Sequence, residues 1–311
     1  MSDAAARRIV EPAEMSRELR MGLLDGKAVV ITGAGRGLGA AYARHVAALG
    51  GAVVVNDVDP EAAGATVAAI GSAGGRAVAL AGDVSDWAFA ASLVEACIDA
   101  FGRIDGLVNN AGILRHGRVT DMTEADFRAM LSVNTVGAAA CASHAIRAML
   151  AAGTAGSVVN VASGSIAGDI ALGGYGASKA AVATLTFAWA LELRDTPVRV
   201  NAVSPLAHTA MAQSNMAFLA QQSASREVSY GELPAADVNA PVIAFLLSDR
   251  SAGINGQIVR IAGDELSFVT HPLIAKPVLK GRWDDDAVAD AFRDALAGRQ
   301  QPLGLGYARG E

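Results

Sequence analysis

Short apolar runs of strand length alternate with longer helical patterns between residues 27 and 263. The runs are almost continuous in valine and isoleucine, which is typical of strands buried on both faces of a parallel sheet. Seven such runs occupy residues 27–32, 52–57, 76–83, 104–110, 156–163, 198–204 and 256–263. Apolar residues at helical spacing lie between them, most clearly in residues 38–49, 86–101, 123–151 and 175–194. The alternation predicts an α/β fold, in which one doubly wound domain has a seven-stranded parallel sheet flanked by helices.

Two segments lie outside this alternation. We expect residues 1–24 to form an N-terminal arm, because charged residues interrupt every apolar run in them. Residues 25–263 then form the domain, and residues 264–311 form a C-terminal extension. The extension contains the stretch WDDDAVADAFRDAL, in which acidic residues precede apolar residues at helical spacing. This pattern predicts a short amphipathic helix.

The composition narrows the class of ligand. Hydrophobic residues make up 52% of the chain, charged residues 18%, and the net charge is −6, so neither nucleic acid nor an anionic membrane would be attracted. Cys97 and Cys141 cannot build a disulfide framework, and no cluster of cysteine and histidine predicts a metal. We see no signal peptide and no apolar stretch of about 20 residues. We therefore expect a cytoplasmic protein that binds a small molecule, with no nucleic-acid or membrane partner.

The stretch TGAGRGLG, residues 32–39, follows the first strand and opens a helix. Gly33, Gly37 and Gly39 allow a tight turn, close approach of the backbone to a pyrophosphate, and close packing of the helix on the sheet. The N–H groups at the helix N-terminus then face the phosphates. This context predicts a Rossmann-type domain that binds a dinucleotide.

The second strand ends in Asp57, eighteen residues after Gly39. A carboxylate at this position accepts hydrogen bonds from the adenosine ribose and repels a 2′-phosphate, which favours NAD. Arg36 argues in the other direction, because a guanidinium can bind that phosphate. We expect NAD as the cofactor, with NADP as the alternative.

Further motifs follow in order along the chain: GDVSD (82–86), NNAG (109–112), SVN (132–134), YGASK (175–179) and NAVSP (201–205). Together with the glycine turn and a serine after the fifth strand, they resemble the short-chain dehydrogenase/reductase family over residues 27–263. The combination is specific. A tyrosine four residues before a lysine is not specific by itself, because four tyrosines and four lysines in 311 residues give that spacing by chance in about one chain in twenty.

The resemblance implies an oxidoreductase and a role for each matching residue. Tyr175 would be the catalytic acid/base, with Lys179 as its partner. Ser163 would hold the substrate oxygen, and Asn134 would organise a proton relay. Ser165 competes with Ser163, because the spacing from Ser163 to Tyr175 is one residue shorter than is usual in the family. The residues implied in cofactor binding are Gly33, Arg36, Gly37, Leu38, Gly39, Asp57, Asp83, Val84, Asn110, Ala111, Gly112, Tyr175, Lys179, Pro205 and Thr209.

The chemistry accounts for these residue types. Alcohol oxidation needs a base, and a free tyrosine with a pKa of about 10 is protonated at neutral pH. Lowering that pKa to about 7 takes roughly 4 kcal/mol of preferential stabilisation of the phenolate, which a nearby cation can supply. Residues four apart on a helix share a face, so Lys179 can lie beside Tyr175. A compact ammonium can also reach the cofactor ribose, which explains why lysine occurs only here between residues 28 and 275, where arginine is otherwise used.

The sequence constrains the substrate less. His116 and His208 follow the fourth and sixth strands, so either can face the substrate, and Met211 lies in an apolar segment after Pro205. In the resembled family this segment covers the substrate. We therefore expect a bulky, mostly apolar alcohol or ketone, such as a hydroxyacyl thioester, a steroid, a terpenoid or another cyclic alcohol. Leu206 departs from the glycine that is usual after Pro205, which affects the local loop geometry.

Two other functions stay open. The first is a catalytically silent dinucleotide-binding or sensory protein, which has no need of all four implied catalytic residues. The second is an NADP-dependent ketone reductase. A sugar-nucleotide epimerase or dehydratase is disfavoured by the glycine spacing and by the short region after residue 263. The alanine-rich stretches 123–151 and 175–194 permit close packing between subunits, so we expect a homotetramer or a homodimer.

Overall fold

A computed structural model of the chain describes residues 22–222, 233–299 and 304–306. Two of the sequence expectations fall partly outside the described residues. The predicted N-terminal arm is described only at residues 22–24, and the segment expected over the substrate is not described at residues 223–232.

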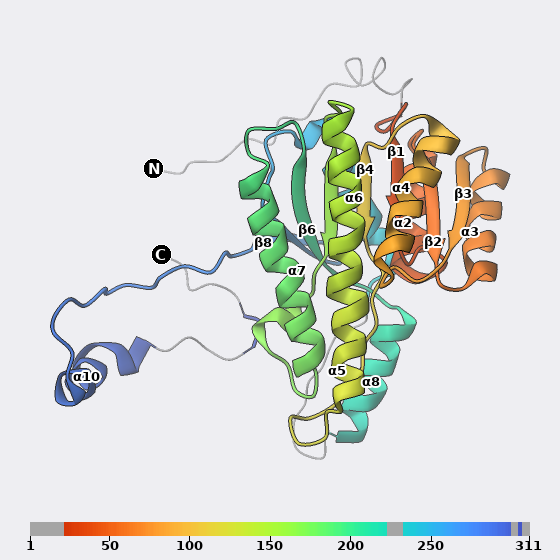
Figure 1. The fold of residues 1–311 in the computed structure, drawn as a ribbon. Coiled ribbons are helices and arrows are strands. Elements are labelled where there is room, and N and C mark those ends of the chain that lie inside the picture. Colours follow the sequence, from red (N-terminus) through yellow and green to blue (C-terminus); the bar gives the residue numbers. More distant parts are fainter. Residues whose placement is uncertain (1–21, 223–232, 300–303, 307–311) are drawn as a thin grey trace, which may run out of the picture.

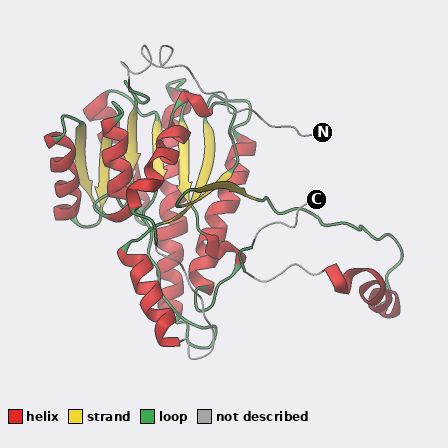
Figure 2. Ribbon diagram, turned by 180° about the vertical axis from the view of Figure 1, so that it is seen from behind, coloured by secondary structure: helices red, strands yellow, loops and turns green. Residues whose placement is uncertain are grey.

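Within the described residues, eight strands form one sheet in the order β3-β2-β1-β4-β5-β6-β7-β8 (Figures 1 and 2). The first seven strands are parallel, and their order changes direction between β1 and β4, as in a doubly wound sheet. The strands are β1 (Ala28–Ile31), β2 (Ala52–Asp57), β3 (Arg76–Ala81), β4 (Gly106–Asn109), β5 (Ser157–Val161), β6 (Arg199–Leu206), β7 (Ile258–Ala262) and β8 (Glu265–Val269).

The predicted count of seven strands is wrong by one, because β8 adds an antiparallel edge. A tight turn at Gly263, with φ of 66°, reverses the chain so that Ala262 pairs with Glu265 and Ile258 with Val269. Four of the five residues of β8 are exposed, so the strand lacks the continuous apolar run that marks the other strands. The predicted C-terminal extension therefore begins as part of the sheet.

Neighbouring residues of a strand face opposite layers of helices, which explains the continuous apolar runs. Val29 and Ile31 of β1 belong to the core between the sheet and one layer, whereas Ala28 and Val30 belong to the core on the other side. The first layer consists of α2 (Gly37–Ala48), α3 (Pro60–Ser72) and α9 (Ala240–Leu247), and the second of α4 (Trp87–Phe101), α6 (Ala138–Ala151) and α7 (Gly173–Glu192).

A long helical segment crosses the second layer (Figure 1). It joins α5 (Glu124–Leu131) to α6 through a π-helical turn at Ser132–Gly137. The segment Glu124–Ala151 is long and apolar enough to cross a membrane by length and composition alone, contrary to the expectation from the sequence. In the fold its apolar side packs on α4 and β4, where Cys141 and Met149 are buried.

Two further parts complete the chain. Helix α8 (Ala210–Gln222) follows β6, at the end of the sheet where the parallel strands terminate. After β8 the chain runs away from the sheet to α10 (Asp285–Ala291), which stands apart from the other helices in both views (Figures 1 and 2). Short helical turns follow α10 at Phe292–Leu296 and Ala297–Arg299.

Candidate active site

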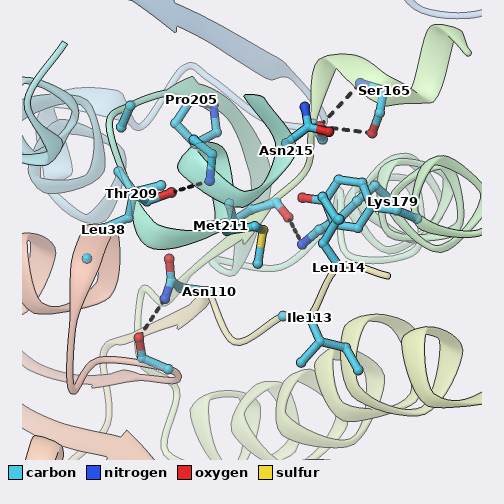
Figure 3. Close-up of a pocket in the computed structure, with 18 of the residues that line it drawn as sticks. Leu38, Asn110, Ile113, Leu114, Ser165, Lys179, Pro205, Thr209, Met211 and Asn215 are labelled. Carbon is cyan, nitrogen blue, oxygen red and sulfur yellow. Dashed lines mark hydrogen bonds between the residues drawn. The ribbon is translucent and has the colours of Figure 1, made fainter. Parts of the chain in front are cut away.

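A cavity of about 1640 Å³ lies at the carboxyl ends of β1, β2, β4, β5 and β6. Open α/β sheets bind ligands at this edge, next to the point where the strand order reverses. Pockets for drug-sized molecules occupy about 300–1,000 Å³, so this cavity has room for a dinucleotide together with a substrate. Side chains from α2, α7, α8 and the loop after β4 converge on it (Figure 3).

The glycine turn forms one wall of the cavity. Gly33 has φ of 60°, and a methyl group built on it would lie 2.8 Å from Cα of Ala111, so only glycine fits there. A methyl group on Gly39 would lie 2.2 Å from the Gly33 carbonyl oxygen, which shows how closely α2 approaches the turn. Asn110 joins the turn to the end of β4, because its Nδ2 donates to the carbonyl oxygens of Thr32 and Gly33 at 2.9 Å each.

The N-terminus of α2 is suited to an anion. Its N-cap residue is Arg36, and among the described residues no side chain caps the first N–H groups of this helix. By contrast, Asp59, Asp86 and Thr123 accept hydrogen bonds from the first N–H groups of α3, α4 and α5. Uncapped N–H groups and the helix dipole together favour a phosphate at this position.

Carboxylates surround the far end of this wall. Asp57 is 9% exposed, and its two oxygens accept from the backbone N–H groups of Gly35, at 2.9 Å, and Asp59, at 3.1 Å. Arg36 forms an ion pair with Asp59, so the guanidinium that could hold a 2′-phosphate already has an acidic partner. The pKa of Asp59 is lowered by hydrogen bonds from the backbone of α3 and by Arg36. This end of the cavity is therefore anionic.

Tyr175 and Lys179 lie on the same face of α7, one turn apart. The Lys179 ammonium is 5.9 Å from the centre of the Tyr175 ring, and Nζ donates to the carbonyl oxygen of Val161 at 2.7 Å. The ring packs in an apolar cluster with Met130 and Leu172. The tyrosine and lysine of YGASK are thus brought together at the cavity wall, as the helical spacing predicts.

Burial shifts the pKa of both groups. It raises the pKa of the Tyr175 phenol to about 12, against the opposing effect of a hydrogen bond from Ser163. It lowers the pKa of the Lys179 ammonium to about 8. At neutral pH the cofactor-free site therefore contains a neutral phenol beside an ammonium that is close to its titration range.

Ser163 follows β5 and begins the short helical turn Gly164–Ala167. Its Oγ accepts hydrogen bonds from the Ser165 backbone N–H at 3.2 Å and from the Ser165 hydroxyl at 3.0 Å (Figure 3). The Ser163 hydroxyl also lowers the pKa of the Tyr175 phenol through a side-chain hydrogen bond, although burial outweighs this effect. Of the two candidate serines, Ser163 is therefore the one that acts on Tyr175, and Ser165 donates to Ser163.

Asn134 lies in the π-helical turn between α5 and α6 and is 1% exposed. Its side chain pairs with the backbone of Ile113, with Oδ1 accepting from N–H at 2.8 Å and Nδ2 donating to the carbonyl at 2.9 Å. Nδ2 also donates to the Ser178 hydroxyl on α7 at 2.9 Å. Insertions of this kind into a helix occur often at functional sites, and here the turn fixes the loop after β4 against α7.

The cavity collects most, but not all, of the residues expected from the sequence. Three of the four implied catalytic residues line it, and Asn134 lies behind the wall. Gly39 packs α2 on the turn without lining the cavity. The other implied cofactor residues on the cavity wall are Gly33, Arg36, Gly37, Leu38, Asp57, Asp83, Val84, Asn110, Ala111, Gly112, Tyr175, Lys179, Pro205 and Thr209.

Of the three substrate candidates added from the sequence, only Met211 lines the cavity. The His116 ring stacks on Phe218 at 4.3 Å between centroids, and its Nε2 pairs with Asn215 Oδ1 at 3.0 Å. His208 pairs with Gln213. Both histidines therefore support α8 and are absent from the cavity wall. Wall residues that the sequence reading missed include Ile113, Leu114, Leu172, Met216, Arg260 and Leu305.

Comparison with known proteins identifies the family. Residues 27–219 match the family described as short chain dehydrogenase. The chain belongs to the short-chain dehydrogenase/reductase family. It is therefore an oxidoreductase of a family that binds NAD(P) and acts on CH–OH groups.

Named relatives agree with this assignment. Cis-4-hydroxycyclohexanecarboxylate dehydrogenase of Sinomonas cyclohexanicum is 37% identical over 241 residues, which cover 76% of this chain and 95% of that protein. A short chain dehydrogenase from Mycobacterium avium is similar in structure, with a TM-score of 0.79 and 31% identity over 93% of this chain and 100% of that one. NAD+-bound xylitol dehydrogenase has a TM-score of 0.72 and 29% identity over 77% of this chain and 99% of that one.

The two serines provide a matched test of the site. Ser163→Ala is expected to lower kcat by about 10²- to 10³-fold, if Ser163 donates to the reacting oxygen as the family resemblance implies. Ser165→Ala removes a neighbouring hydroxyl and should lower kcat by less than about tenfold, because the Ser165 backbone N–H still orients Ser163. Steady-state kinetics of both variants would measure the difference. Equal losses, or a larger loss for Ser165→Ala, would reverse the two roles.

Proposed function

We propose that the protein is an NAD-dependent oxidoreductase that interconverts a secondary alcohol and a ketone by hydride transfer, with Tyr175 as acid/base. The observation that carries the proposal is the position of Tyr175, Lys179 and Ser163 on one cavity, which continues to the uncapped N-terminus of α2 and to Asp57. A catalytically silent dinucleotide-binding protein would need the N-terminus of α2 and Asp57, but it would not need Tyr175, Lys179 and Ser163.

The residues present fit a dinucleotide along the cavity. The turn at Gly33 and Gly37 would supply backbone N–H groups for a pyrophosphate, and both glycines have the positive φ that this tight turn requires. Asp57 would accept hydrogen bonds from the adenosine ribose hydroxyls. Lys179 would reach the nicotinamide ribose. When bound, the nicotinamide supplies the hydride acceptor and a positive charge beside the phenol.

In the oxidation direction, the phenolate form of Tyr175 would take the hydroxyl proton of the alcohol, while the carbinol carbon would give a hydride to the bound nicotinamide. Lys179 stabilises the phenolate form of Tyr175, because its ammonium is the nearest cation on the same helix face. Ser163 would donate a hydrogen bond to the substrate oxygen, keeping its proton, and so stabilise the negative charge that develops there. In the reduction direction, the neutral phenol of Tyr175 returns the proton to the ketone oxygen.

The walls nearest Tyr175 favour a bulky, apolar substrate. Leu172 clusters with Tyr175, whereas Ile113, Leu114 and Met211 pack against this cluster, and all of them line the cavity. Such a surface can bind the ring of a cyclic alcohol through apolar contact, and the name of the relative from Sinomonas cyclohexanicum supports this class. Hydroxyacyl thioesters, steroids and terpenoids share the same apolar character. We therefore propose a cyclic or similarly bulky secondary alcohol as substrate.

Cofactor choice gives a direct test. We expect kcat/KM with NAD+ to exceed that with NADP+ by at least about 100-fold, because Asp57 and Asp59 oppose a 2′-phosphate, and close like charges cost several kcal/mol. Asp57→Ala should lower the ratio of kcat/KM with NAD+ to kcat/KM with NADP+ by about tenfold or more. The measurement is steady-state kinetics with a panel of cyclic secondary alcohols and both cofactors.

Glu61→Ala is a matched control for that experiment. Glu61 lies in the first turn of α3, close to Asp59 in sequence, but it does not line the cavity. Its removal changes the net charge equally and should leave the cofactor ratio unchanged. A wild-type preference for NADP+ would contradict the cofactor assignment, and absence of turnover with any alcohol would contradict the proposed function.

A further inference from the structure

The C-terminal extension returns to the cavity after its excursion through α10. Gly304 and Leu305 line the same cavity as Ser163 and Tyr175, although they lie more than 30 residues beyond the end of β8. Both Figures 1 and 2 show α10 well away from the body of the protein, whereas Gly304 and Leu305 lie on the cavity wall. Nothing in the sequence motifs assigns a role to these residues.

The contacts place Leu305 next to the catalytic serine. A methyl group built on Gly164 would lie 2.8 Å from Leu305 Cδ2, so the leucine packs directly on the backbone that follows Ser163. Gly304 approaches the other end of the same turn, where a methyl group built on it would lie 3.9 Å from the Gly168 carbonyl oxygen. Leu305 is 48% exposed, so its contact with the turn covers only part of the side chain.

We propose that Leu305 is a specificity-determining residue, which limits the apolar group that the substrate can carry on the Ser163 side of the cavity. The proposal rests on the proposed function and deepens it. Leu305 adds an apolar wall to a region whose other close neighbour is the guanidinium of Arg260, 3.8 Å from the same built methyl position. The side chain of Leu305 thus defines how far a ring or chain extends past Ser163.

The glycine at position 164 provides an internal check on this packing. Its φ is not in the left-handed region, so the backbone accepts alanine, and the only close clash of an added methyl group is with the end of the Leu305 side chain. Gly164→Ala should therefore act by displacing Leu305. In a Leu305→Ala background the same methyl group has room, and its effect should disappear.

The test compares cyclohexanol with 4-phenylcyclohexanol, each with NAD+, in the full-length enzyme. Leu305→Ala is expected to raise the ratio of kcat/KM for the phenyl compound to kcat/KM for cyclohexanol by about tenfold, and Leu305→Phe to lower it by a similar factor. Gly164→Ala should change the ratio by about threefold or more in the wild-type background and by less than about twofold in the Leu305→Ala background.

Leu273→Ala serves as the control. It makes the same deletion in the same extension, at a side chain that is 85% exposed and not on the cavity wall, and it should leave the ratio unchanged. If Leu305→Ala and Leu305→Phe both keep the wild-type ratio, or if Leu273→Ala changes the ratio as much, the proposal is overturned.

A failure of the proposed function is recognised separately, because the wild type would then oxidise neither alcohol. In that case the apolar wall formed by Leu305 is tested by the binding of cyclohexanone and 4-phenylcyclohexanone to the NADH complex. NADH fluorescence would monitor the binding. Leu305→Ala should tighten the binding of the phenyl ketone relative to cyclohexanone by about tenfold. Unchanged relative dissociation constants would overturn the role of Leu305.

Discussion

Replacement of Tyr175 by phenylalanine is expected to lower kcat by at least about a thousandfold and to leave the Kd for NAD+ within about twofold of wild type. The substitution removes only the hydroxyl, and the ring keeps its packing against Met130 and Leu172. Without that hydroxyl the described lining of the cavity contains no phenol, because Tyr175 is the one tyrosine among those residues. Steady-state kinetics would measure kcat, and isothermal titration calorimetry would measure the Kd for NAD+.

Tyr42→Phe is the matched control for this prediction. Tyr42 is completely buried in α2, away from the cavity, and its hydroxyl has no hydrogen-bond partner among the described residues. Removal of this hydroxyl should leave kcat unchanged and the stability equal or slightly higher. Retention of more than about a tenth of wild-type kcat in Tyr175→Phe would contradict its role as acid/base. A wild-type protein that binds NAD+ but oxidises no alcohol would instead support the silent binding protein.

The parallel part of the fold could be predicted from the sequence because strands that are buried on both sheet faces have continuous apolar runs. Six of the seven predicted runs contain a whole strand and the run 198–204 contains most of β6, since every position in a strand such as β2 must be apolar or hydrogen-bonded internally. β8 has no such apolar run, because this edge strand has exposed residues and is held by backbone pairing to β7 rather than by apolar burial. Its signal was the turn at Gly263, which the sequence alone did not distinguish from the end of the domain.

The residues of the candidate site also fall into those that local sequence predicts and those that depend on tertiary contacts. Gly33, Asp57, Tyr175 and Lys179 could be found because local geometry demands them: a positive φ, a strand end, or two positions on one helix face. Leu305 could not be found, because its place depends on where a long excursion of the chain ends. His116 follows β4, as the sequence predicts, but it is not on the cavity wall, because contacts with Asn215 and Phe218 set the direction of its ring.

Replacement of Lys179 by methionine is expected to lower kcat by about a hundredfold or more, because it removes the cation that stabilises the Tyr175 phenolate. It should also change how stability depends on pH. Burial lowers the pKa of Lys179 from 10.5 to about 8 in the folded protein. Between those two pH values the unfolded chain binds the proton more tightly, so the free energy of unfolding of the wild type gains up to about 1.4 kcal/mol per pH unit from this group as pH rises.

The variant lacks that contribution, so the difference in unfolding free energy between wild type and Lys179→Met should grow in favour of the wild type from pH 8 to pH 10. The slope is the diagnostic quantity, because the variant also leaves the Val161 carbonyl without its donor at every pH. Cys97 and Cys141, whose pKa values burial raises, are common to both proteins and cancel in the difference. Urea unfolding of the cofactor-free proteins between pH 8 and pH 10 would measure this difference in unfolding free energy. Lys280→Met is the control for the loss of one exposed charge. A difference that stays constant with pH would show that the Lys179 ammonium is not destabilised by burial, and the account of why a lysine stands beside Tyr175 would then have to rest on the cofactor alone.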